Sequence, residues 1–185
     1  MATHPARRGW SYAEFARLPD DGNRYEIIDG DLYVTPSPRL DHQDVVGALV
    51  EVLRPFVREQ DLGKVYAGPV DVLFAEGDYL APDLVYLSTE RLHYRSRRGI
   101  EGPPDLVVEV LSPGTAVRDR NLKRERYALY GVPEYWIVDV DARRVEVYRP
   151  GYEAPTIHAD RLAWEPVEGG PVLELDLEEI FADLD

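Results

Sequence analysis

Residues 104–114 read PDLVVEVLSPG, and this stretch decides how the chain folds. Short runs of Val and Leu that are bounded by Pro or Gly are typical of buried β-strands. The exception within the run is Glu109. Because successive side chains of a strand point to opposite faces, Glu109 shares a face with Val107 and Leu111. We therefore expect a central strand that carries one carboxylate on an apolar face.

The segments on either side of this strand predict a mixed sheet. A helix is expected to follow the Ser-Pro-Gly turn and to end at Gly131, with Pro133 beyond it. Strands followed by a helix that crosses back to another strand indicate an α/β or α+β architecture, with a mixed β-sheet flanked by helices. The predicted strands are 70–74, 83–87, 105–111, 134–139 and 144–148, and the predicted helix is 118–130.

Smaller elements are predicted towards the two ends of the chain. Ser11 and Glu14 have capping-box spacing, and Asp29-Gly30 suits a hairpin turn. Apolar residues at helical spacing predict a long helix, which Pro55 should kink or cut short. The predicted ranges are a helix over 12–18, a hairpin of 25–28 and 31–34, a helix over 45–57, a strand over 172–175 and a short helix from 177.

Length and composition suggest one domain. A chain of 185 residues with 44% hydrophobic content can bury one sizeable core, so residues 1–185 are interpreted as a single domain. The absence of cysteine excludes disulfides and thiolate metal sites. The first ten residues lack the apolar stretch of a signal peptide, and no apolar run is long enough to span a bilayer. We expect a cytoplasmic protein that does not associate with membranes.

The charge is unevenly distributed. The net charge of −14 argues against a protein that coats nucleic acid, because such binding requires clustered cations. Residues 91–126 nevertheless contain nine Lys and Arg against five Asp and Glu. This basic segment either attracts a polyanionic substrate such as nucleic acid or is an ordinary solvated loop and helix.

Several familiar catalytic motifs are missing from the sequence. There is no GxGxxG fingerprint, P-loop, GxSxG elbow or HExxH motif, and the four histidines are too scattered to suggest zinc. A glycosidase with two carboxylates is disfavoured because nothing in the sequence indicates a sugar-binding cleft. The remaining candidates are carboxylates in unusual places.

Glu109 and Asp83 are the main candidates for metal ligands. A buried carboxylate usually pairs, shifts its pKa or binds a metal, although Glu109 could also lie half-solvated or pair with an arginine. Asp83 follows Pro82 at the start of a predicted strand, where a surface turn is the alternative. Two carboxylates with a main-chain carbonyl between them form an all-oxygen set that suits Mg²⁺.

Lys123 is the candidate for a catalytic cation. It lies on the helix that follows the Glu109 strand, and the turn between them could fold the helix back over the strand end. An ammonium there could lower the pKa of an attacking water and offset charge in the transition state. The alternative is a surface lysine that pairs with Asp119, four residues earlier.

Four ordered strings of sequence resemble a known family. They are YEIIDGDL at 25–32, APDLV at 81–85, PDLVVEVLSPGT at 104–115 and GVPEYWIVD at 131–139. The strings resemble the PD-(D/E)xK nuclease superfamily, and more closely its Uma-two (Uma2) family of restriction-endonuclease-like proteins. The resemblance extends to a fifth, shorter string, VEVY at 145–148.

The resemblance implies a restriction-endonuclease-like core with a divalent metal, Mg²⁺ or Mn²⁺. Asp83, Glu109 and the Val110 carbonyl would be its ligands, and Glu26 an accessory carboxylate. The superfamily's lysine normally lies two residues after the glutamate, where this chain has Leu111. The resemblance implies that the lysine has moved to the next helix, as Lys123.

The function expected from these residues is metal-dependent hydrolysis of phosphodiester bonds in nucleic acid, with DNA a better candidate than RNA. The catalytic residues would be Asp83, Glu109, Lys123 and Glu26. We also expect a homodimer or a higher homo-oligomer. The alternative is a catalytically inactive nuclease-like module that binds nucleic acid or protein.

Overall fold

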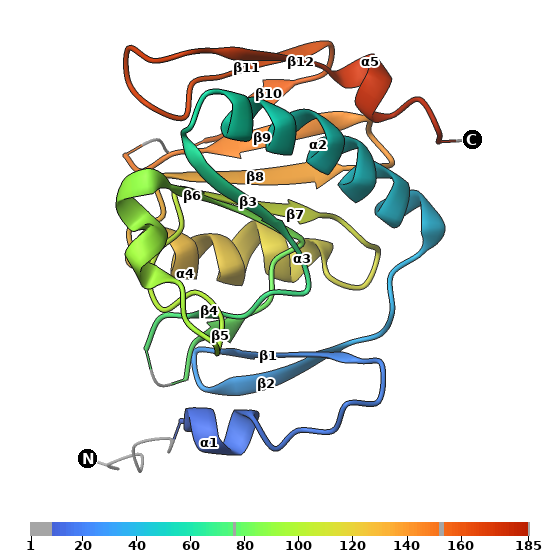
Figure 1. Ribbon diagram of the computed structural model, residues 1–185. Coiled ribbons are helices and arrows are strands. Elements are labelled where there is room, and N and C mark those ends of the chain that lie inside the picture. Colours follow the sequence, from blue (N-terminus) through green and yellow to red (C-terminus); the bar gives the residue numbers. More distant parts are fainter. Residues whose placement is uncertain (1–8, 76, 152–153, 185) are drawn as a thin grey trace.

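The computed structural model describes residues 9–75, 77–151 and 154–184. Within these ranges the strands form a large sheet of six strands, a small sheet of four and a separate pair. Figure 1 shows the large sheet in the middle of the molecule and the small sheet beside the N-terminal helix. The predicted mixed sheet with flanking helices is confirmed.

The large sheet has the strand order β10-β9-β8-β7-β6-β3. The predicted central strand is β7, which pairs in parallel with β8 and antiparallel with β6. The other neighbours in this sheet are antiparallel. The bounds are β3 Gly63–Ala67, β6 Leu84–Ser88, β7 Leu106–Val110, β8 Glu134–Asp139, β9 Arg144–Tyr148 and β10 Thr156–His158.

The small sheet has the order β2-β1-β5-β4. Asp29 and Gly30 both have positive φ, which confirms the hairpin turn between β1 and β2. A five-residue strand over 70–74 was wrong, because Phe74 and Asp78 close a turn that leaves two-residue strands on either side. The bounds are β1 Arg24–Ile28, β2 Asp31–Thr35, β4 Val72–Leu73 and β5 Tyr79–Leu80.

The remaining elements are helices and one antiparallel strand pair. Across the described part of the chain, every helix is too short or too polar to cross a bilayer. The bounds are α1 Tyr12–Phe15, α2 Leu40–Glu59, the 3₁₀ helix η1 Thr89–Tyr94, α3 Ala116–Arg118, the π-helix η2 Asp119–Lys123, α4 Arg124–Leu129, β11 Arg161–Trp164, β12 Leu173–Asp176 and α5 Leu177–Ile180.

Helices cover both faces of the large sheet. Along β7, Leu106, Val108 and Val110 pack in the core beneath α2, whereas Val107 packs in the core that contains Tyr127 of α4. The two helices lie on opposite sides of the sheet in Figure 1. Glu109 therefore belongs to the face covered by η2 and α4, as its spacing from Val107 predicts.

Two helix predictions need correction. An early end at Pro55 is wrong, since α2 continues to Glu59 and Val57, beyond the proline, is buried in the core. A continuous α-helix over 118–130 is also wrong, because its first part is the π-helix η2. Single π-helical turns of this kind are common at functional sites.

Candidate functional site

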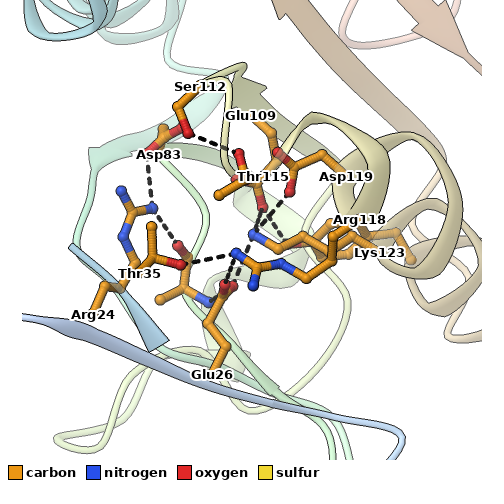
Figure 2. Close-up of polar contacts among 12 residues, drawn as sticks. Arg24, Glu26, Thr35, Asp83, Glu109, Ser112, Thr115, Arg118, Asp119 and Lys123 are labelled. Atoms are coloured by element: carbon orange, nitrogen blue, oxygen red, sulfur yellow. Dashed lines mark hydrogen bonds and ion pairs between the residues drawn. The ribbon is translucent and has the colours of Figure 1, made fainter. Parts of the chain in front are cut away.

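The four predicted catalytic side chains come together in one cavity between the two sheets. The cavity has a volume of about 240 Å³, and its wall includes Glu26 from β1, Asp83 before β6, Glu109 from β7 and Lys123 from η2. Val110, the predicted source of a carbonyl ligand, also lines it. Figure 2 shows Glu26, Glu109 and Asp119 around the ammonium of Lys123, whereas Asp83 contacts Arg24.

Lys123 is buried among three carboxylates. Its Nζ lies 2.8 Å from Glu26 Oε1, 2.9 Å from Glu109 Oε1 and 3.5 Å from Asp119 Oδ1. The side chain is only 2% exposed. The predicted pairing with Asp119 exists, but the surface-lysine alternative is wrong, because the pair lies inside the protein.

Glu109 is buried, and two partners hold one of its oxygens. Its Oε1 accepts hydrogen bonds from Lys123 and from the Tyr127 hydroxyl at 3.0 Å. The half-solvated alternative and the arginine pair are both wrong, since the residue is 2% exposed and its cation is a lysine. Burial raises the pKa of Glu109, and the nearby charge of Lys123 offsets only part of that rise.

Asp83 lies opposite Glu109, one residue beyond the Leu84–Val108 pair of β6 and β7. Its Oδ2 accepts the Val110 N–H at 2.9 Å and lies 3.1 Å from His42 Nε2. Its Oδ1 accepts from Arg24 at 2.8 Å.

The surroundings of Asp83 stabilise its charged form. Burial would raise its pKa, but the hydrogen bond to His42 and the charge of Arg24, with the Val110 N–H, lower the pKa to about 2. Because Asp83 is buried, the surface-turn alternative is wrong.

Glu26 connects the small sheet to the helical segment. Its Oε1 accepts the Ala81 N–H at 3.0 Å, and its Oε2 lies 3.6 Å from Arg118. Arg118 also donates to the Thr35 hydroxyl at 2.8 Å, so it bridges α3 and β2 across the cavity (Figure 2). The site is therefore assembled from both sheets and from the helices beside them.

The charges of this cluster do not balance. Burial lowers the pKa of Lys123, but the carboxylates around it outweigh that effect and raise the pKa, so the ammonium stays charged. With every group in its charged form, the carboxylates outnumber the cations by one, and a further cation would neutralise that excess. Its carboxylates are Glu26, Asp83, Glu109 and Asp119, and its cations are Arg24, Arg118 and Lys123.

The oxygens of Asp83 and Glu109 are hard donors, which fit Mg²⁺ or Mn²⁺. Among the described residues, no group of three or more His, Cys, Asp or Glu side chains is placed to hold a metal. A metal at this site would therefore need main-chain oxygen or water to complete its coordination, as Mg²⁺ sites often do.

Sequence reasoning missed Arg118 and three further residues of the site, and each of these three has a recognisable signal in the sequence. Arg24 lies two residues before Glu26, so both point to the same face of β1. His42 precedes Val45 by three positions on the buried face of α2. Tyr127 follows Lys123 by four positions and faces the same side.

The basic segment 91–126 is mostly neutralised within the protein. Six of its nine cationic side chains form ion pairs with carboxylates, so the excess of positive charge in sequence is not a continuous free patch. The six are Arg91, Arg98, Arg118, Arg120, Lys123 and Arg126.

The fold is shared with a solved structure. A protein from Anabaena variabilis ATCC 29413, described as "a putative nuclease belonging to DUF820", is 23% identical, with a TM-score of 0.76. The match covers 93% of this chain and 97% of that one. At this level of identity the likeness supports the fold alone.

The family is identified from the sequence as a whole. A search of curated proteins found no match. The model of the Uma2 family, described as "Putative restriction endonuclease", matches residues 12–178, which is nearly the whole chain and includes every residue of the site. The chain therefore belongs to the Uma2 family, as the four sequence strings predict.

Proposed function

We propose that this protein is a nuclease that uses Mg²⁺ or Mn²⁺ to hydrolyse phosphodiester bonds. The observation that supports this most directly is the position of Lys123. Its ammonium lies 2.9 Å from Glu109 in a cavity shared with Asp83, although it comes from a helix rather than from the strand. The nuclease-like family supports the same function.

Asp83 and Glu109 would hold the metal, together with the Val110 carbonyl. Among the described residues, Glu109 Oε2 has no hydrogen-bond partner, which leaves one oxygen available. The negative charges of Asp119, Asp83 and Glu26 near Glu109 also favour a cation close by. A bound metal of this kind polarises the phosphate and lowers the pKa of a water.

Lys123 would act on the water and on the transition state. Its buried ammonium can orient a nucleophile and offset the charge that develops on the phosphate oxygens. Glu26 accepts from Lys123 at 2.8 Å and so fixes the direction of that side chain. Glu26 would thus position Lys123 rather than contact the reacting atoms.

The direct test is incubation of the purified protein with labelled single- and double-stranded DNA and RNA, with and without MnCl₂. We expect cleavage that requires the metal and is lost in Asp83→Asn and Glu109→Gln. Lys123→Met should lose most cleavage while it still binds Mn²⁺ in calorimetry, because the ammonium acts on the substrate. Cleavage at the wild-type rate in Lys123→Met would remove Lys123 from the mechanism.

A second variant tests whether the lysine can act from either backbone position. Leu111 lies two residues after Glu109 on the same face, is partly buried and lines a neighbouring cavity of about 390 Å³. In Lys123→Leu with Leu111→Lys, we expect partial recovery of cleavage over Lys123→Leu alone. A folded but fully inactive double variant would contradict this equivalence. Unfolding by urea checks the fold of both.

The non-catalytic alternative also has an observation in its favour. Both oxygens of Asp83 already accept hydrogen bonds, as expected of a carboxylate with a structural role. Two results with Mn²⁺ present would show that the protein is a non-catalytic binding module. Wild-type protein would cleave no nucleic acid, and it would bind nucleic acid as tightly as Asp83→Asn does.

We also propose that DNA is the preferred substrate and that the protein is a homo-oligomer. The cleavage test with labelled DNA and RNA compares the two substrates directly. Light scattering after gel filtration measures the mass in solution, and a mass of one chain at micromolar concentration would contradict the oligomer.

A further inference from the structure

The two oxygens of Asp83 have unlike partners. Oδ2 is held by the main-chain N–H of Val110 and by His42, which is 5% exposed. Oδ1 is held by Arg24, whose side chain is 19% exposed and lines the cavity. One oxygen is thus fixed by the framework of the protein, and the other is covered by a side chain that reaches solvent.

Arg24 is held by only one of its guanidinium nitrogens. Nη1 donates to Asp83 Oδ1 at 2.8 Å and to the Ala81 carbonyl at 2.9 Å. Nε and Nη2 have no hydrogen-bond partner among the described residues. Most of the fork that guanidinium uses to bind phosphate therefore remains free.

Arg24 also lies within electrostatic reach of the carboxylates that would hold the metal. Arg24, Asp83, Glu109 and Glu26 all line the same cavity. A divalent cation on Asp83 Oδ1 would meet the positive charge of Arg24 at close range, in a buried site where charges are poorly screened. The metal ion and the Arg24 guanidinium therefore cannot both contact Oδ1 without strong electrostatic repulsion.

We propose that Arg24 is a built-in countercation, which covers the metal-binding oxygen of Asp83 in the metal-free protein and turns to the substrate phosphate when the metal binds. This inference rests on the proposed function, because it assumes the metal site at Asp83 and Glu109. It makes metal binding and phosphate binding mutually dependent through one side chain.

The first test measures Mn²⁺ affinity by calorimetry in wild type, Arg24→Gln and a matched control. Arg91 is a suitable control, because it also pairs with a carboxylate, Asp105 at 3.2 Å, and donates to main-chain carbonyls. We expect Arg24→Gln to tighten Mn²⁺ binding about tenfold, because it removes a competing charge. Arg91→Gln should leave the affinity unchanged.

Outcomes of this test separate the inference from the proposed function. Weaker or unchanged Mn²⁺ binding in Arg24→Gln, with wild type binding normally, overturns the inference alone. Binding in neither protein overturns the metal site as well. Binding only in Arg24→Gln supports the competition, since it shows that the arginine had blocked the site.

A second test uses the binding of a labelled oligonucleotide with and without CaCl₂, which supplies a divalent cation. In wild type we expect Ca²⁺ to tighten binding, because it releases Arg24 towards the phosphate. In Arg24→Gln most of this gain should disappear. An equal gain in both proteins would overturn the coupling.

A third measurement needs no destabilising variant. The side-chain Nε–H signal of Arg24 in wild-type protein, assigned with Arg24→Lys, can be followed by NMR during a MgCl₂ titration. We expect this signal to shift along with metal binding, while that of Arg91 stays in place. An Arg24 signal that does not move as the metal binds would overturn the proposal.

Discussion

Two ion clusters face the same π-helical segment, η2, and they differ in their balance of charge. Lys123 is one ammonium among three carboxylates. Arg120, three residues earlier, pairs with Asp139 at 2.6 Å and with Glu146 at 2.8 Å. The second cluster has additional donors to Glu146, which are Arg144 and the Tyr148 hydroxyl.

Burial and the balance of nearby charges both contribute to the difference between the two glutamates. Glu109 and Glu146 are 2% and 4% exposed, and both are aligned with Ile137 across the sheet. Burial would raise the pKa of Glu146, but hydrogen bonds from Arg120 and Tyr148 lower it, whereas the pKa of Glu109 is raised. Deeper burial together with a shortage of cations therefore distinguishes the candidate site from a structural ion network.

The largest effect is expected from removing the central cations. Lys123→Ala should lower the free energy of unfolding by about 3–5 kcal/mol, because it leaves buried carboxylates without their ammonium. Arg120→Ala should cost only about 1 kcal/mol, since Arg120 is 31% exposed and its pairs are partly screened. Urea unfolding at pH 8 measures both. Equal losses would show that the two clusters do not differ.

Neutralising the two glutamates should have effects of opposite sign. Glu146→Gln should destabilise the protein by about 2 kcal/mol, because it weakens bonds to two arginines. Glu109→Gln should stabilise the metal-free protein by about 1 kcal/mol, because it removes a desolvated charge from an acidic cluster. The comparison requires the same urea series without metal, and a loss in both variants would contradict it.

Adding a metal should distinguish the clusters again. With MnCl₂ at ten times its Kd, wild type and Glu146→Gln should gain about 1.4 kcal/mol of stability. Glu109→Gln should gain almost nothing, since it lacks a ligand. Thermal unfolding with and without MnCl₂ measures this, and a full gain in Glu109→Gln would place the metal elsewhere.

The pH dependence of stability should also have opposite signs for the two glutamates. Because the folded pKa of Glu109 is raised, this residue lowers stability as pH rises above its ordinary pKa of 4.5, by at most about 1.4 kcal/mol per pH unit. The lowered pKa of Glu146 acts in the opposite way, so its contribution is present above 4.5 and is lost below it. Glu109→Gln should therefore flatten the alkaline side of the curve, and Glu146→Gln the acidic side.

The sequence predicts the central strands better than the edges. β7 and β8 are apolar runs buried on both faces, and such runs are recognisable without any tertiary information. β3 was missed because it is half-exposed and lies at the edge of the sheet. β5 was missed because two residues are too few to form a pattern.

The residues of the site also differ in how well the sequence predicts them. Asp83 and Glu109 are recognisable because each is a carboxylate in or beside a buried strand. The contacts of Asp83 with Arg24 and His42 cannot be recognised from the sequence, because these partners lie 59 and 41 residues away from Asp83 along the chain. Such pairings depend on how β1 and α2 pack, which no local pattern specifies.

The π-helical winding of η2 limits how this chain can vary in length. A turn of this kind accommodates one more residue than an α-helical turn, and each residue rotates a helix by about 100°. Loss of a single residue between Asp119 and Lys123 would rewind the segment and turn either Lys123 or Arg120 away from its carboxylates. Homologues of this chain should therefore keep a constant number of residues between the β7 glutamate and the helical lysine, even where the residues between them change.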